Sequence, residues 1–183
     1  MALLHKAQIV PGKAELLARW LPTRSWYTGP ATAPERVASA RFDDPAGEVG
    51  IETMIVRAGD GSLLHVPLTY RGAPLAGADQ WLVGTTEHSV LGTRWVYDAA
   101  GDPVYAAQVA EVIRTAGREA VEEVESDGEL VRREPSLRLR GSGDAAGARE
   151  LTVIRVLGPV PPGATLTGAW DGDGSPAVLA VLS

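Results

Sequence analysis

The feature that most constrains the fold is a helix signal between Asp102 and Gly117. Asp102 is a good capping residue and Pro103 follows at the first helical position, a combination typical of a helix start. Apolar residues then recur along one side of the predicted helix, and Gly117 is placed to end it. Because such a stripe must be covered, the sequence predicts that this helix lies on a sheet built from the flanking strands. The stripe consists of Tyr105, Val109, Val112, Ile113 and Ala116.

A β-hairpin is predicted before this helix. Residues 49–57 and 64–70 each alternate between two kinds of side chain, and the turn sequence AGDGS separates them. Pro67 in the second strand predicts an edge or a bulge, because proline donates no hydrogen bond to a neighbouring strand. His65 falls on the more polar side of that strand, which favours a surface position over a role as a ligand. Further strands are expected at residues 2–10, 36–44, 81–87 and 94–98.

A short helix is predicted at residues 13–21, with apolar residues at helical spacing on one face. Trp20 lies on that face, and Trp26 and Tyr27 follow it closely. These three aromatic residues leave two interpretations open, an aromatic contact surface or ordinary core packing. Core packing is favoured, because apolar residues at helical spacing are more often buried.

Strands alone are predicted after the main helix. Residues 119–125 and 130–133 form a hairpin through Asp127 and Gly128, since both positions of that dipeptide tolerate positive φ. Residues 141–147 (GSGDAAG) are the only candidate joint between two parts of the chain. The remaining strands are expected at residues 137–140, 151–157, 165–170 and 177–182.

The order of these elements predicts an α+β fold. Strands follow one another in hairpin order without βαβ alternation, which argues against a parallel doubly wound sheet. We expect one curved antiparallel sheet, or two stacked sheets, packed on the main helix near residues 102–117, with additional C-terminal antiparallel strands. The 183 residues, of which 45% are hydrophobic, suit a single domain with a sizeable core.

The composition narrows the classes of function. The net charge is −6, which argues against nucleic acid and anionic membranes as main partners. Cysteine is absent, so disulfides, thiolate catalysis and cysteine metal sites are excluded. The first residues lack the pattern of a signal peptide, and no apolar run is long enough to span a membrane. These features lead us to expect a cytoplasmic location.

The sequence predicts no metal site and no cofactor. His5, His65 and His88 are widely separated and match no metal-binding spacing. The loop around Asp171 and Asp173 lacks the further oxygen ligands of a calcium site, which favours a plain hairpin turn. The glycine-rich runs match neither a phosphate-binding loop nor a dinucleotide fingerprint.

A polar and aromatic cluster is expected around the two strands that precede the main helix. Glu87, His88 and Ser89 are the residue types of a nucleophilic site, but sequence neighbours rarely point into one pocket and no G-x-S-x-G elbow is present. His88 therefore has three interpretations, a polar turn, a ligand or partner contact, and a catalytic role. No catalytic residue is assigned, and the aromatic members suit a core as well as a sugar-binding surface. The candidate contact residues are Trp81, Glu87, His88, Arg94, Trp95, Tyr97 and Asp98.

Several short motifs carry a family resemblance. They are HSVLG at residues 88–92, WVYDA at residues 95–99, DPVY at residues 102–105 and VPLTYR at residues 66–71, together with His5 and the first helix. This set resembles the N-terminal cap region of actinobacterial maltokinases and related aminosugar kinases over roughly residues 1–117. The whole chain is similar to stand-alone maltokinase N-terminal cap-like proteins, whose C-terminal strands residues 118–183 resemble.

The resemblance implies a curved antiparallel sheet against helices, similar in outline to cystatins. In the kinases the cap precedes a body that binds ATP and sugar. This sequence contains no glycine-rich nucleotide loop and no HRD or DFG motif, so kinase activity does not carry over. The implied function is that of a non-catalytic accessory or regulatory protein, with a kinase or an α-glucan or trehalose enzyme as partner.

Two other functions remain open. One is a small-molecule binding module, for example for a sugar, that uses the aromatic and polar cluster. The other is an enzyme that uses Glu87, His88 and Asp98. We also expect that such a fold can form a homodimer by pairing exposed strand edges.

Overall fold

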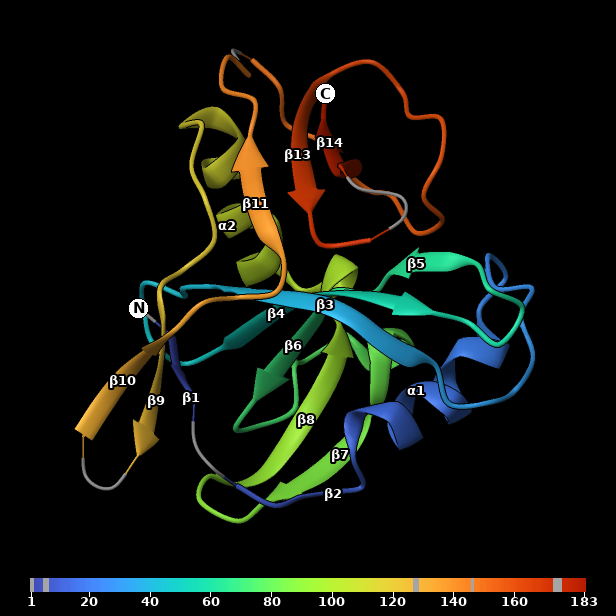
Figure 1. Cartoon of the computed structure of the whole chain (residues 1–183), viewed down its shortest axis with the longest axis vertical. Helices are drawn as coiled ribbons and strands as arrows, with labels where there is room; N and C mark the ends of the chain where they lie inside the picture. Colours follow the sequence, from blue (N-terminus) through green and yellow to red (C-terminus); the bar gives the residue numbers. More distant parts are fainter. Residues whose placement is uncertain (1, 5–6, 127–128, 146, 173–175) are drawn as a thin grey trace.

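The computed structural model describes residues 2–4, 7–126, 129–145, 147–172 and 176–183 (Figure 1). The helices are α1 (Lys13–Trp20) and α2 (Pro103–Arg114), with 3-10 turns η1 (Leu21–Thr23), η2 (Asp79–Trp81) and η3 (Ala99–Gly101). The predicted α+β class is confirmed. The strands are β1 (Ala2–Leu4), β2 (Ile9–Val10), β3 (Glu35–Phe42), β4 (Gly50–Arg57), β5 (Leu63–His65), β6 (Leu68–Arg71), β7 (Leu82–His88), β8 (Gly92–Asp98), β9 (Glu122–Ser126), β10 (Glu129–Arg133), β11 (Arg138–Gly141), β12 (Leu151–Val153), β13 (Ala164–Ala169) and β14 (Ala177–Leu182).

The largest sheet is antiparallel and strongly curled (Figure 1). Its strand order is β2-β7-β8-β6-β4-β3, and β5 adds to β4. The predicted hairpin is confirmed, because β4 pairs with β5 and with β6. The chain leaves strand conformation at Val66 and Pro67 between those two strands, as the proline predicted.

Helix α1 covers one face of this sheet. Trp20 is buried at 4% exposure, and its ring meets that of the partly buried Trp26 edge to face at 5.9 Å. Tyr27 is also buried, and its hydroxyl donates to the carbonyl of Pro30. Core packing of these aromatic residues, the favoured interpretation, is therefore confirmed.

Helix α2 packs against the curled sheet and against a C-terminal sheet of order β11-β13-β14-β12, and Figure 1 shows the helix and the C-terminal sheet side by side over the curled sheet. The side chain of Asp102 accepts a hydrogen bond from the N–H of Val104, so the predicted cap is confirmed. Tyr105, Val109 and Ile113 are fully buried in the core that both sheets share. The predicted stripe is thus covered on two sides, which fits the prediction of stacked sheets around this helix.

The end of α2 differs in detail from the prediction. Ala116, at φ 51°, takes the left-handed conformation that the sequence assigned to the neighbouring glycine. Gly117 instead donates its N–H to the carbonyl of Val112 at 2.8 Å. A second glycine is required by close packing, since a Cβ on Gly141 would lie 2.0 Å from that same carbonyl oxygen. The glycine lets β11 approach the end of α2.

A smaller sheet brings the N-terminal strand β1 beside the hairpin that follows α2. The predicted hairpin of β9 and β10 is confirmed, and its turn residues, Asp127 and Gly128, lie outside the described residues. The first strand pairs with it in parallel as β1-β9-β10, a pairing that no local pattern indicated. The expected strand at residues 2–10 is two strands, β1 and β2, and His5 lies outside the described part, as does Asp173.

The predicted surface position of His65 is wrong. The residue is fully buried, and its Nδ1 lies 3.1 Å from the carbonyl oxygen of Ile154. Beyond β12 the chain crosses to β5, where the carbonyl of Arg155 accepts the N–H of His65 at 2.8 Å. The more polar side of β5 is therefore covered by a segment about 90 positions away in sequence, which strand alternation alone does not reveal. Burial, helped by the charge of Arg155, lowers the pKa of His65 to about 3.

Because His65 is buried, the free energy of unfolding should fall in mild acid, at pH values above those at which carboxylates titrate. Below about pH 6.5 the unfolded chain binds a proton that folded His65 rejects until about pH 3, so stability falls as pH drops. The loss is at most about 1.4 kcal/mol per pH unit. Urea unfolding between about pH 6.5 and pH 5 measures this slope. His65→Gln should flatten it and His88→Gln should retain it; equal slopes in wild type and His65→Gln would contradict the assignment.

Candidate functional site

Strands β7 and β8 divide the predicted contact residues between two faces of the sheet. Their antiparallel register places His88 and Arg94 on one face. Glu87, Trp95 and Tyr97 alternate with them and point to the other face. The structure therefore does not bring the predicted cluster together on one surface.

Two of the predicted residues are held inside the fold. Tyr97 is 1% exposed, and its hydroxyl oxygen accepts the N–H of Leu75 at 2.8 Å. Asp98 is also 1% exposed, and its two carboxylate oxygens accept from Nη2 of Arg155 at 2.6 and 2.7 Å. Both side chains thus serve contacts within the protein.

Three other predicted residues lie away from any shared pocket. The indole of Trp81 packs so closely on η3 that a Cβ added to Gly101 would lie 2.1 Å from the ring. Trp95 is half-buried on the same face of the sheet as Glu87. Glu87 is exposed, and its carboxylate accepts the hydroxyl of Thr93 at 2.8 Å.

Glu87, His88 and Asp98 do not form one catalytic centre. Glu87 and His88 are consecutive in β7 and point to opposite faces. His88 pairs with Gly92 at the start of β8, whereas Asp98 ends that strand. Six residues of extended chain separate these positions by about 20 Å. A mechanism that needs all three groups in contact has no geometric basis here.

His88 and Arg94 instead line a cleft of about 450 Å³. Nδ1 of His88 accepts the N–H groups of Val90 and Leu91 at 3.2 and 3.1 Å, and Nη2 of Arg94 donates to the carbonyl of Leu91 at 2.6 Å. The β7–β8 turn thereby fixes both side chains at the cleft. Its full lining is Ile9, Lys13, Arg41, Phe42, Asp43, Asp44, Gly47, Glu48, Val49, Gly50, Ile51, Tyr70, Thr86, His88, Leu91 and Arg94.

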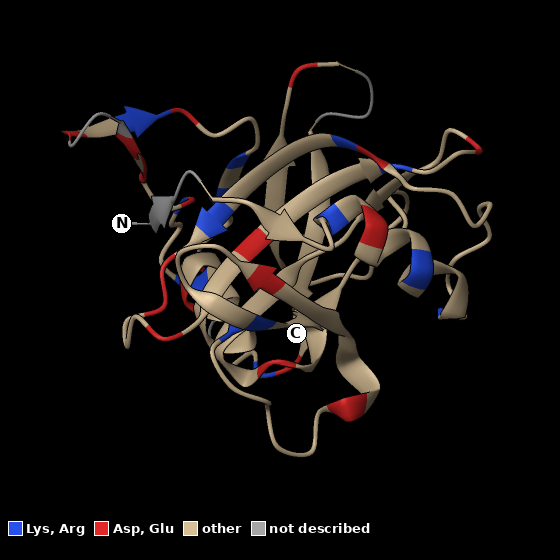
Figure 2. Cartoon of the chain, turned by 90° about the horizontal axis from the view of Figure 1, so that it is seen from below, with Lys and Arg blue, Asp and Glu red and all other residues tan. Residues whose placement is uncertain are grey.

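A buried charge cluster ties three of the lining residues together. Nζ of Lys13 donates to both carboxylate oxygens of Glu52 at 2.8 and 2.6 Å, and the hydroxyl of Tyr70 donates to one of them at 2.7 Å. Nη2 of Arg41 lies 3.6 Å from the same carboxylate. Both cations also lie over the ring of Tyr70, at 5.6 and 5.7 Å from its centre. Figure 2 shows acidic and basic positions interleaved on the strands and on α1.

The cluster shifts the pKa values of its members. Burial alone would raise the pKa of Glu52, but the charges of Arg41 and Lys13 outweigh burial and lower it to about 2. Burial lowers the pKa of Lys13, and the nearby Glu52 carboxylate offsets only part of this effect. Burial, reinforced by Glu52, raises the pKa of Tyr70 well above its usual value. Glu52 therefore stays ionised and binds the cations at this end of the cleft, and Tyr70 stays protonated.

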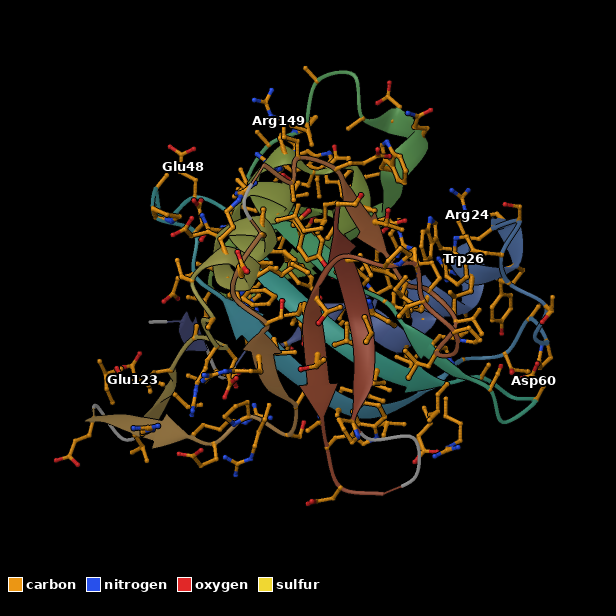
Figure 3. All side chains as sticks on the ribbon, turned by 90° about the horizontal axis from the view of Figure 1, so that it is seen from above. Arg24, Trp26, Glu48, Asp60, Glu123 and Arg149 are labelled. Carbon is orange, nitrogen blue, oxygen red and sulfur yellow. The ribbon has the colours of Figure 1, made fainter. Side chains whose placement is uncertain are left out.

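The opposite rim of the cleft is a loop between β3 and β4. The carboxylate of Asp44 accepts the backbone N–H groups of Ala46, Glu48 and Val49 at 3.0, 3.0 and 2.9 Å, which fixes the loop. The side chain of Glu48 is exposed and points outward (Figure 3). The cleft is thus lined by fixed cations and by an acidic loop that its own backbone hydrogen bonds hold in place.

The alternation predicted for residues 49–57 does not reveal this cluster, because it implies that Glu52 lies on the polar side of a strand with one exposed face. Residues 51–56 of β4 are all buried, since α1 covers one face and α2 the other. A near-continuous apolar run around a single acid was the available signal, because a charge in a strand covered on both faces requires partners.

The sequence of the curled sheet matches a known protein family. Residues 20–102 match the family model of the maltokinase N-terminal cap domain. The predicted family resemblance is confirmed over this range. The match begins at the last residue of α1 and ends at the cap of α2, so it contains β3 to β8. The cleft draws most of its lining from this maltokinase cap-like part, with Ile9 and Lys13 added from outside the match. A search of curated proteins finds no match to the chain.

Two further features are absent from the part of the chain that the structure describes. Within it, no helix has the length and apolar character needed to cross a membrane. No group of three or more histidine and acidic side chains there is arranged to hold a metal ion.

Replacing the buried carboxylate of Glu52 is expected to destabilise the protein. Glu52→Gln leaves Lys13 and Arg41 facing each other without their counter-charge, which should cost about 3 kcal/mol in urea unfolding. Adding Lys13→Met to that variant should recover part of the loss. Glu15→Gln is the matched control, because its pair with Arg19 is exposed and should contribute less than about 1 kcal/mol. A stability of Glu52→Gln close to that of wild type would refute the account.

Proposed function

We propose that this protein is a non-catalytic, cap-like accessory or regulatory module that acts by docking on another protein. The observation that carries the proposal is the match of residues 20–102 to the maltokinase cap, which coincides with the curled sheet and its polar cleft. The acids considered for catalysis support it, because Asp98 is bound by Arg155 and Glu87 lies on the other face of the sheet. The partner proposed is a kinase or an α-glucan or trehalose enzyme, and the setting proposed is the cytoplasm.

The end of the β7–β8 hairpin is the proposed docking surface. Val90 and Leu91 in its turn are 57% and 45% exposed, and Val10 in β2 is 67% exposed. β2 pairs with β7 in the register that sets Val10 against Glu87, so the three apolar side chains belong to one end of the sheet. Exposed apolar residues gathered beside a polar cleft are typical of a contact surface.

Capture of the partner tests this proposal. The tagged protein should recover a kinase or an α-glucan or trehalose enzyme from its native cell, as identified by mass spectrometry, and the purified pair should bind in solution. Val90→Asp should weaken that binding at least about tenfold, because it places a charge in the apolar contact. Val121→Asp is the matched control, since Val121 is exposed elsewhere. Recovery of the protein alone, at low and high salt, would count against the proposal.

The cleft supports a second candidate function, binding of a small sugar or sugar phosphate. Fixed donors such as Arg94, together with the aromatic ring of Tyr70, suit a ligand rich in hydroxyl groups. This assignment differs from the sequence-based one, which used Trp81, Trp95 and Tyr97 as stacking faces.

Equilibrium binding distinguishes the two candidates. Calorimetry against malto-oligosaccharides, trehalose and sugar phosphates should detect a ligand, and Arg94→Met should weaken its binding about tenfold or more. Arg140→Met is the matched control, because Arg140 is exposed on β11 away from the cleft. A flat response across all these compounds removes the second candidate and leaves the docking module.

A further inference from the structure

The hairpin of β9 and β10 stands away from the body of the protein. Figures 1 and 3 show it projecting at the edge of the molecule, with Glu123 at its surface. All five residues of β10 are exposed, and Leu130 and Val131 are 55% and 52% exposed. These two apolar side chains point to opposite faces of the strand, so both faces of the projecting hairpin leave apolar surface in water beside its edge.

The outer edge of β10 is open in the part of the chain that the structure describes. β10 ends the three-stranded order β1-β9-β10, so its far side faces no described strand. By contrast, β3 ends the large sheet but its edge is covered, because Ser39 and Arg41 accept backbone N–H groups of Leu137 and Ala120 at 3.1 and 2.8 Å. An open edge presents backbone groups ready to pair with another strand.

The sequence of β10 is self-complementary in one antiparallel register. Two antiparallel copies of this strand in one sheet are related by a two-fold axis perpendicular to the sheet. Each residue therefore pairs with a residue of the second copy whose side chain points to the same face of the sheet. Centring the pair on Val131 sets Val131 against its own copy and Glu129 against Arg133 of the second copy, twice. The stem of Arg132 then lies opposite Leu130.

The neighbouring registers lack this complementarity. Centring the pair on Arg132 places two guanidinium groups opposite each other, which is unfavourable. Centring it on Leu130 sets Glu129 against Val131 and leaves both acids without an opposite charge. Charged residues often protect an edge strand from pairing; here their order favours a single pairing instead.

We propose that the partner of this edge is a second copy of the chain. Two β10 strands pair antiparallel about Val131 and extend the β1-β9-β10 sheet into one continuous sheet across the dimer. The contact uses none of the residues that line the cleft or that form the proposed docking surface. Because it involves a short strand from each copy, the dimer forms at high protein concentration and weakens with salt.

Single cysteine variants test the register directly, because the chain contains no cysteine. Val131→Cys should form a crosslinked dimer under mild oxidation, since the paired Cα atoms would lie about 5 Å apart. Leu130→Cys is equally exposed but should crosslink poorly, because its Cα atoms would lie about 8 Å apart. Equal crosslinking of the two variants, or none in either, overturns the proposal.

Charge exchange tests the ion pairs in the protein without cysteines. In sedimentation experiments wild type should dimerise with rising concentration, and Glu129→Arg should weaken this about tenfold because two pairs become repulsive. Adding Arg133→Glu should restore part of the dimerisation, because this change also removes the contact of Arg133 with the buried Glu122 carboxylate of its own hairpin at 3.9 Å. Glu111→Arg, the same charge change on the exposed surface of α2, is the control and should have little effect. A monomeric wild type at every concentration, or no recovery in the exchanged variant, rules out the dimer.

Discussion

Burial of the apolar side of α2 is the interaction on which the rest of this structure depends. Tyr105, Val109 and Ile113 have no exposed surface, and residues of the curled sheet and of the C-terminal sheet share their core. A helix of this length is only marginally stable by itself in water, so its stability comes from packing against the apolar faces of these two sheets. The cap-like part and the C-terminal strands therefore stabilise each other through one helix.

A buried carboxylate fixes the start of that helix. Oδ1 and Oδ2 of Asp102 accept from Nη2 and Nε of Arg71 at 2.6 and 2.8 Å, and Oδ2 also accepts the hydroxyl of Thr69 at 2.8 Å. Burial opposes the charge of Asp102, but these hydrogen bonds and the N–H of Val104 lower its pKa overall. The cap of α2 is thus bonded directly to β6, which orients the helix on the sheet.

The same arrangement recurs at two other buried acids. Asp98 joins the end of β8 to Arg155 from the C-terminal part, and Glu52 joins β4 to α1 through Lys13. Each acid connects segments that are distant in sequence, and each is satisfied by a cation. This explains why Asp98, which suggests catalysis in the sequence, is held in a contact within the fold.

Local sequence patterns predicted the helices and strands. Contacts between distant segments determined which polar residues are buried and which residues share a face. The cap at Asp102, the stripe of α2 and the hairpin of β4 and β5 follow from short-range spacing, and the structure contains all three. His65 could not be placed this way, because a segment near Ile154 covers it. The candidate site was predicted only in part, since alternation in β7 and β8 sends His88 and Arg94 to one face and the aromatic residues to the other.

Hydrogen exchange across the two sheets tests the central claim, that α2 binds them into one cooperative core. Amides in β4, α2 and β14 should exchange through the same global opening, with equal free energies and an equal response to denaturant. Exchange of β14 at a clearly lower free energy than β4, while α2 remains protected, would show that the C-terminal strands open independently and would contradict the account.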